Sequence, residues 1–240
     1  MGLPAIAILL APATCFPAWY ERYRVFETDT PRVRSGASTV NGNVQARPED
    51  LARAASQAIG RNVSVEAYTL ARYLSSEVGS GTLGEKVAVA QNALNRVRYI
   101  EPRVKTATNL LLYRQASGHP NRGFYGPIHG SAGVSSAPYG RWAATSRDPS
   151  VGDLHIALGV LSGDIDPSFS KGADDQMGPE HLNDPVASVV SHGKNRRQYW
   201  VGPIPGVDPW HTIQYRTIKD LDPSSALGQT LIARGVAAMK

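Results

Sequence analysis

Apolar residues between positions 65 and 97 recur at steps of three or four, which is the spacing of one face of an α-helix. Two such stripes follow one another: Val65, Tyr68, Ala71, Leu74 and Val78, and then Val87, Ala90, Leu94 and Val97. They are separated by Gly79-Ser80-Gly81, where the apolar pattern stops. The sequence therefore predicts two helices joined by a short turn that contains glycine.

The start of the second helix carries a capping signal. Thr82 is followed three positions later by Glu85, the spacing at which a hydroxyl and a carboxylate satisfy backbone N–H groups at a helix N-terminus. Glu85 is therefore predicted to be structural rather than catalytic. Residues 79–84 also read G-x-G-x-x-G, but a dinucleotide site needs a preceding strand and an acidic residue about twenty positions later. Here a helix precedes the glycines and Val104 stands at the acidic position, so a helix–helix turn is favoured.

The rest of the chain predicts an α+β protein that is mainly helical. Residues 49–59 read as a short helix, residues 153–163 form an apolar, helix-compatible stretch, and residues 221–239 are partly helical in pattern. Residues 200–205 contain two prolines and a glycine, which is more typical of an extended loop. The region 119–139 is rich in glycine, and a cleft wall or a small sheet is expected there.

The first residues of the chain are unusually apolar. Residues 3–19 carry no charge, but they are fewer than the roughly twenty that a spanning helix needs, and three prolines interrupt them. The segment lacks the basic start of a standard export signal, although Ala11-Pro12-Ala13 resembles a small-residue cleavage site. Two interpretations stay open: a signal or membrane-contacting segment, and a buried docking strand. Residues 32–48, rich in Ser, Gly, Asn and Thr, read as a linker.

The length of 240 residues allows one well-packed domain with extensions. We expect an apolar N-terminal segment and linker at residues 1–48, a central domain at residues 49–182 and a C-terminal appendage at residues 183–240. No internal repeat is evident.

The basic charge favours an anionic partner. A formal net charge of +5 and a pI near 9.4 suit wall glycan with teichoic acid, nucleic acid or a membrane surface. The best basic cluster, at residues 194–197, is short and lacks interleaved aromatic residues. Nucleic acid is therefore not expected as a partner.

The sequence lacks the residues that several reaction classes need. Cys15 is the sole cysteine, so no intramolecular disulfide can form and a cysteine peptidase is not expected. The six histidines show no H-E-x-x-H or other close ligand spacing. No G-x-S-x-G nucleophile motif is present either. The sequence therefore predicts neither a metal site nor a cofactor.

Glu77 is the first catalytic candidate. It stands at the end of the first predicted helix, beside the glycine break, where a carboxylate can lie at the edge of a cleft. Partial desolvation at such an edge raises a carboxyl pKa toward the value that a general acid needs. An ordinary surface glutamate is the alternative.

The residues around Glu77 also resemble a known family. Ala71-Arg72 is followed by Glu77, then by the run GEKVAVA at residues 84–90 and by LNRV at residues 94–97. This order, ungapped from residue 70 to residue 97, is similar to the signature of the cell-wall hydrolase family typified by the spore-cortex lytic enzymes (SleB-like). A weaker echo extends the resemblance over residues 65–177.

The resemblance implies a lysozyme-like, helix-rich single domain that cleaves the glycan strand of peptidoglycan. It implies that Glu77 is the catalytic acid and that Asn95 and Arg96 support the site. A simple charge at the helix C-terminus is the alternative for Arg96. Two departures from the family pattern stand out. The family usually has a second Glu four residues after the first, and this chain has Gly81 there. The weaker echo includes Asp166-Pro167-Ser168 and Gly172-Ala173, and the spacing between these two elements is also longer than usual in the family.

The carboxylates bear on the type of reaction. Glycoside hydrolysis commonly uses two carboxylates, about 5 to 9.5 Å apart, and no second acid stands out close to Glu77. Folding would have to bring one near, and the candidates are Asp148, Asp153, Asp164, Asp166, Asp174 and Asp175. A lytic transglycosylase needs one acid/base only, because the muramic 6-hydroxyl attacks the anomeric carbon, and the resembled family includes such enzymes. Transglycosylation is therefore favoured over hydrolysis.

Aromatic residues in stretches rich in Gly and Pro supply faces on which sugar rings stack, with packing in the core or in loops as the alternative for each. The predicted substrate-binding set is Tyr73, Asn95, Arg96, Phe124, Tyr125, Tyr139 and Trp142. The predicted partner is the peptidoglycan glycan strand, with membrane or virion contact through residues 3–19. The predicted location is extracytoplasmic, in periplasm or cell wall, or on a phage virion. A non-catalytic wall-binding or virion structural protein is the alternative function.

Overall fold

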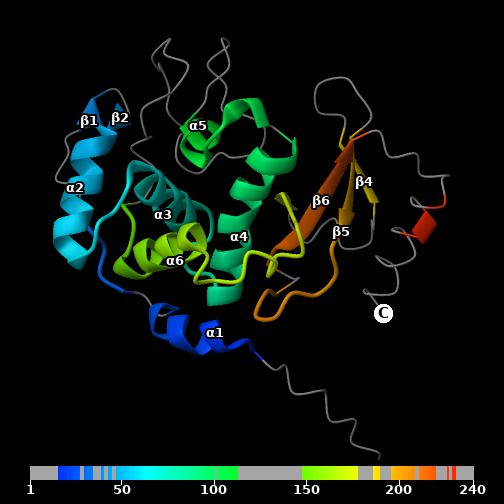
Figure 1. Ribbon diagram of the computed structural model, residues 1–240, viewed down its shortest axis with the longest axis horizontal. Coiled ribbons are helices and arrows are strands. Elements are labelled where there is room, and N and C mark those ends of the chain that lie inside the picture. The colour runs from blue at the N-terminus through cyan, green and yellow to red at the C-terminus, as the bar shows by residue number, and fades with distance from the viewer. Residues whose placement is uncertain are drawn as a thin grey trace, which may run out of the picture.

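The computed structural model describes residues 16–27, 30–34, 39–40, 43–44, 47–100, 102–112, 148–177, 186–189, 196–208, 211–219, 226 and 229–230 of the chain. These residues form an α+β fold in which helices predominate, as the sequence predicts. Figure 1 shows a body of helices on one side and a small antiparallel sheet on the other, with α4 between them.

Three helices form the centre of the helical body: α3 (Val65–Glu77), α4 (Leu83–Asn95) and α6 (Val151–Ser162). α3 contacts the other two and is also covered by α2 (Pro48–Ile59) and α5 (Ala107–Leu112). Residues 67–75 of α3 are all buried. Because its neighbours enclose α3, the helix becomes accessible to solvent again only at its last residues, Ser76 and Glu77.

Several shorter elements accompany these helices. They are α1 (Ala18–Tyr23), the 3-10 helices η1 (Arg24–Phe26) and η3 (Pro102–Val104), the π-helical turn η2 (Arg96–Ile100), and the hairpin strands β1 (Thr39–Val40) and β2 (Asn43–Val44).

The helix boundaries follow from local capping. The capping box predicted at α4 is confirmed: the Glu85 N–H donates to Thr82 Oγ1 at 3.2 Å, and the Thr82 N–H donates to Glu85 Oε2 at 2.9 Å. Ser150 and Asp153 form the same reciprocal cap at α6. The helices expected at residues 49–59 and 153–163 are α2 and α6, so these predictions are confirmed as well.

The sheet is four-stranded and antiparallel, in the order β3-β6-β5-β4, and it contacts α4 through β3. Its strands are β3 (Asp175–Met177), β4 (Val186–Val189), β5 (Arg196–Trp200) and β6 (Ile213–Lys219). Asp175 pairs with Tyr215, and Gln198 pairs with Thr217. The sheet joins strands from both sides of residue 183, so residues of the expected central domain and of the expected appendage share one sheet.

α1 belongs to the core of the helical body. Its aromatic residues Trp19, Tyr20 and Tyr23 are buried, and the Trp19 ring packs edge-to-face on Phe169 with ring centroids 4.9 Å apart. Most of the apolar segment at residues 3–19 lies outside the described residues. Among the described helices, none is both long and apolar enough to cross a bilayer.

The start of the expected linker is tied to the N-terminus of α6. The Val33 N–H donates to the Pro149 carbonyl at 2.8 Å, and the Val151 N–H donates to the Pro31 carbonyl at 2.9 Å. Val33 is buried. The chain therefore contacts the helical body here, before α2 begins at Pro48.

A buried ion pair joins α4 to α6. Lys86 Nζ lies 3.0 Å from Asp153 Oδ1, and both side chains are almost completely buried. Burying two charges has a large desolvation cost, which the attraction between them offsets only while both are present. The pair therefore fixes the position of α6 against α4.

Candidate functional site

Glu77 lies where α3 leaves the core. It is the last residue of the helix and is partly exposed, whereas the residues one turn earlier are buried. The next residue, Val78, ends the helix with its N–H bonded to the Leu74 carbonyl, and the Gly81 N–H closes the following turn on the Val78 carbonyl. The sequence-based placement of Glu77 at a helix end, beside a glycine-containing turn, is confirmed.

Tyr73 lies one turn before Glu77 and is only 1 % exposed. Burial raises the pKa of its hydroxyl well above the usual value, the carboxylates of Glu77 and Asp175 raise it further, and Arg96 opposes them. The Tyr73 hydroxyl therefore stays neutral and lies within electrostatic range of all three charged groups. We refer to Tyr73, Glu77, Arg96 and Asp175 as the Glu77 cluster.

Tyr73 was predicted to offer a face for a sugar ring. A ring that is almost fully buried presents no such face. The structure instead places Tyr73 in the core beneath Glu77, where it supports the end of α3.

Arg96 connects α4 to the sheet. It is the first residue of the π-helical turn and is buried. Its Nη2 donates to Asp175 Oδ2 at 2.6 Å, and its Nε donates to the Asp174 carbonyl at 3.1 Å. Gln198 Nε2, from β5, also donates to Asp175 Oδ2, at 2.7 Å. Asp175 is thus held from both the helical side and the sheet side.

Asp174 faces away into the core. Burial raises the pKa of its carboxyl group, and Arg96 and the Thr217 N–H oppose that rise. The Thr217 N–H donates to Asp174 Oδ1 at 2.7 Å, and Asp174 Oδ2 lies 4.0 Å from Arg96 Nε. Asp174 therefore joins β6 to the end of α4 rather than facing solvent.

Asn95 binds the segment that precedes Asp174. Its Nδ2 donates to Ser170 Oγ at 3.2 Å and to the Ala173 carbonyl at 2.8 Å. Its side chain is buried. Asn95 and Arg96, which the resemblance implies as site supports, both contact the chain that carries Asp174 and Asp175.

The structure separates the aspartates that were candidates for a second carboxylate. Asp175 is brought to the Glu77 cluster. Asp148 instead pairs with Arg72 at 2.7 Å, Asp153 pairs with Lys86, and Asp166 binds the N–H and hydroxyl groups of Ser168 in an exposed turn. Nothing in the sequence singled out Asp175 among them, and Gln198 carried no signal at all.

The space at position 81 is already filled. A Cβ on Gly81 would lie 2.7 Å from Glu85 Oε2, and Glu85 itself is buried. The other oxygen of Glu85 lies 2.8 Å from Nδ1 of His211. The carboxylate of Glu85 therefore occupies the place into which a side chain at position 81 would extend.

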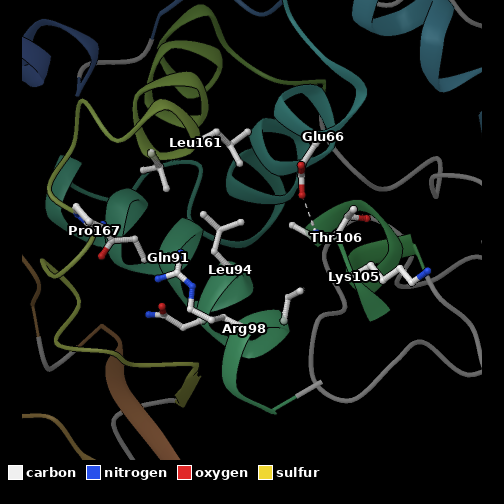
Figure 2. Close-up of a pocket in the computed structure, with 12 residues that line it drawn as sticks. Glu66, Gln91, Leu94, Arg98, Lys105, Thr106, Leu161 and Pro167 are labelled. Atoms are coloured by element: carbon white, nitrogen blue, oxygen red, sulfur yellow. Dashed lines mark hydrogen bonds between the residues drawn. The ribbon is translucent and has the colours of Figure 1, made fainter. Parts of the chain in front are cut away.

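A pocket of about 380 Å³ opens at the opposite end of α3 from Glu77 (Figure 2). It is lined by α3 at Glu66, by α4 and the turn after it, by the start of α5 and by the end of α6. Asn95 is part of its wall. The sequence carried no signal for this pocket, because its lining comes from five separate segments.

The predicted aromatic residues Phe124, Tyr125, Tyr139 and Trp142 lie outside the described residues. In the described part of the chain, no three His, Cys, Asp or Glu side chains are grouped closely enough to bind a metal ion.

Comparison of the chain with protein-family models, with curated proteins and with solved structures found no match. Function is therefore inferred from the Glu77 cluster and from the sequence pattern between residues 70 and 97.

Proposed function

We propose that this chain is a lytic transglycosylase that cleaves the glycan strand of peptidoglycan, with Glu77 as its acid/base and a lysozyme-like arrangement of helices and sheet. One observation carries the proposal. Glu77 is a partly exposed carboxylate at the end of a buried helix, and the Tyr73 beneath it also lies within electrostatic range of a second carboxylate, Asp175, and of Arg96.

Glu77 performs both proton transfers. It donates its proton to the glycosidic oxygen as the bond to the anomeric carbon breaks. The carboxylate then accepts the proton of the muramic 6-hydroxyl, whose oxygen attacks the anomeric carbon. Glu77 returns to its acid form, and the product ends in a 1,6-anhydro ring.

Asp175 has an electrostatic role in this proposal. Its Oδ2 accepts hydrogen bonds from Arg96 and Gln198, and its Oδ1 accepts one from the Gln176 N–H. A carboxylate engaged on both oxygens is a poor partner for a water molecule that must be deprotonated. Its fixed negative charge instead stabilises the positive charge that develops on the sugar ring in the transition state.

Hydrolysis is the second candidate reaction, and Asp175 is the observation that favours it. Glycosidases that hydrolyse use two carboxylates, and Asp175 is the second carboxylate of the Glu77 cluster. A non-catalytic wall-binding or virion protein is the candidate from another class, and it is favoured by Gly81, where the resembled family has a Glu.

The partner under this proposal is the wall glycan, and the place of action is the periplasm, the cell wall or a phage particle. These assignments follow from the substrate, because the polymer lies outside the cytoplasm.

The same Glu→Gln substitution at two positions tests the role of Glu77. Glu77→Gln keeps the shape of the side chain and removes its titrating group, so the rate of fragment release from purified sacculi should fall roughly 10²-fold or more. Glu49→Gln makes the same change at an exposed position on α2 and should leave the rate unchanged. Similar rates for both variants would refute the assignment.

Asp175→Asn separates the two reactions. The amide retains an oxygen that Arg96 can bind, so an electrostatic role predicts a rate lowered by about tenfold with unchanged products. A loss as large as that of Glu77→Gln would make Asp175 the second catalytic carboxylate and would favour hydrolysis.

A further inference from the structure

Two backbone irregularities border the pocket shown in Figure 2. One is the π-helical turn, which contributes Val97 and Arg98, and the other is Lys105, whose φ of 73° is in the left-handed region. π-helical turns occur often at functional sites. A left-handed conformation is uncommon for a residue with a side chain and costs about 1 kcal/mol or more. Both irregularities place a cationic side chain at the same pocket.

Most of the neutral polar groups in the pocket already have partners. Gln91 donates to the Asp166 carbonyl and accepts from the Ser170 N–H, and Asn95 donates to the segment that follows. Thr106 accepts from the Asn109 N–H. These groups therefore stabilise the wall of the pocket, because their hydrogen bonds are made within the protein.

The charged groups are arranged differently. Glu66 Oε1 accepts from the Ala107 N–H at 2.8 Å, which fixes this carboxylate at the start of α5. Arg98 and Lys105 are exposed, and neither side chain has a hydrogen bond or an ion pair to another described residue. The Arg98 guanidinium lies over the Tyr99 ring, 5.8 Å from its centroid. Figure 2 shows Glu66 and Arg98 on opposite sides of Leu94, with Lys105 extending outward at the edge of the pocket. Two cationic side chains without an ion pair to any described residue thus border a pocket that contains one engaged carboxylate.

The remainder of the lining is apolar. It consists of Leu94, Val97, Ala107, Val160, Leu161 and Pro167. Side chains of this size leave room for small aliphatic groups, and a volume of about 380 Å³ falls in the range of small-molecule sites.

We propose that this pocket binds the carboxylate end of a short peptide with small aliphatic side chains. Arg98 and Lys105 bind the terminal carboxylate, because a guanidinium and an ammonium recognise a carboxylate through charge-assisted hydrogen bonds. The aliphatic side chains pack on Leu94 and Leu161. The free oxygen of Glu66 accepts an N–H of the peptide.

The position of the pocket suits the stem peptide of the wall, whose free end carries two alanines; this identification rests on the proposed function. Glu66 and Glu77 are eleven residues apart on α3 (77 − 66), which corresponds to about 16 Å along a helix that rises about 1.5 Å per residue. An extended chain of five residues spans about 17 Å. A stem peptide attached near the cleavage point therefore reaches the pocket, and the enzyme prefers glycan whose stem peptides are not cross-linked.

Calorimetric titration of the full chain tests the binding site. The probe is the synthetic pentapeptide L-Ala-D-Glu-L-Lys-D-Ala-D-Ala, compared with the same peptide as its C-terminal amide. We expect the free acid to bind about tenfold or more tightly than the amide, because hydrogen bonds to charged groups contribute this much. Equal binding of acid and amide, or no binding of either, would overturn the proposal.

Substitutions locate the site. Arg98→Gln and Lys105→Asn should each weaken binding of the acid about tenfold; asparagine is chosen at position 105 because it tolerates a left-handed backbone. Arg103→Gln removes the same charge from an exposed neighbour outside the pocket and should change binding less than twofold. Equal effects of the three substitutions would show a general charge effect and no site.

The two proposals fail separately. If the chain binds the acid through Arg98 and Lys105 but releases no fragments from sacculi, the peptide site stands and the proposed cleavage is wrong. If the chain cleaves sacculi through Glu77 but binds acid and amide equally, the cleavage stands and the peptide site is wrong.

Discussion

Replacing Gly81 with alanine tests whether the carboxylate of Glu85 fills the space beside position 81. A Cβ at position 81 would lie 2.7 Å from Glu85 Oε2 and 3.1 Å from the Val78 carbonyl oxygen. Gly81 is not among the glycines with a positive φ, so its backbone conformation is open to alanine. The conflict is therefore with the Glu85 side chain, which must move.

The expected loss of stability follows from what Glu85 holds. Moving its carboxylate breaks the hydrogen bond to the Thr82 N–H and the contact with Nδ1 of His211. Loss of a helix cap costs about 0.5 to 2 kcal/mol, and loss of a hydrogen bond costs about 0.5 to 1.5 kcal/mol. Against this, a glycine-to-alanine change at a compatible position stabilises by about 0.4 to 1 kcal/mol through the unfolded chain. The balance is a destabilisation of about 1 to 2 kcal/mol.

Thermal and urea unfolding of a double-mutant cycle measures this balance. Gly81→Ala should lower Tm by about 2 to 8 °C. Ser80→Ala, at the exposed neighbouring position of the same turn, should change Tm little. In a Glu85→Ala background, Gly81→Ala should lower the unfolding free energy much less. The coupling free energy between positions 81 and 85 is then about 1 kcal/mol. A more stable Gly81→Ala protein, or additive effects in the cycle, would show that the Glu85 carboxylate does not occupy this space.

Three further predictions concern the body of the fold. A chain that begins at residue 50 lacks the three buried aromatic side chains of α1, each of which contributes about 1.5 to 3 kcal/mol; it should lose cooperative unfolding in calorimetry, and a cooperative transition would contradict the packing of α1. Lys86→Met leaves the Asp153 carboxylate buried without its partner charge, so the unfolding free energy measured in urea should fall by about 3 to 5 kcal/mol. The double variant Lys86→Met/Asp153→Asn should recover part of that loss. Burial, and then Arg61, lowers the pKa of His155 below 6.5, so the stability that its neutral form contributes is present above that pH and is lost as the pH falls through it. His155→Phe should therefore reduce the fall in unfolding free energy between about pH 7 and about pH 5, and an unchanged pH dependence would contradict this.

The helix pair around Glu77 could be predicted because its signals are local. The apolar stripes of α3 and α4 repeat within each helix, and the Thr82–Glu85 cap joins residues three positions apart. The position of Glu77 at a helix end follows from these two signals alone. The same holds for α2 and α6, whose limits are set by Pro48 and by the cap at Ser150.

The surroundings of Glu77 could not be predicted, because they depend on contacts between residues far apart in the chain. The sequence showed several aspartates, and only the pairing of β3 with β6 and the bond from Arg96 bring Asp175 to Tyr73. Tyr73 shares a helix face with Glu77, yet its burial depends on helices that pack around α3 later in the chain. The role of α1 was also hidden, since the apolar segment fitted an export signal as well as a docking element.

The aromatic residues expected to line a sugar-binding groove remain predictions. Phe124, Tyr125, Tyr139 and Trp142 lie outside the described residues, so the proposed function does not rest on them.

Mass spectrometry of the fragments released from purified sacculi distinguishes transglycosylation from hydrolysis and shows whether Glu77 is required. With Glu77 as the only acid/base, the bond from the anomeric carbon to the glycosidic oxygen breaks and the muramic 6-hydroxyl oxygen bonds to that carbon. The released fragments should therefore end in 1,6-anhydromuramic residues, each lighter by one water than a hydrolytic product. Their release should disappear in Glu77→Gln and persist in Glu49→Gln. Fragments with only reducing ends would contradict transglycosylation, and release that survives Glu77→Gln would contradict the assignment of Glu77 itself.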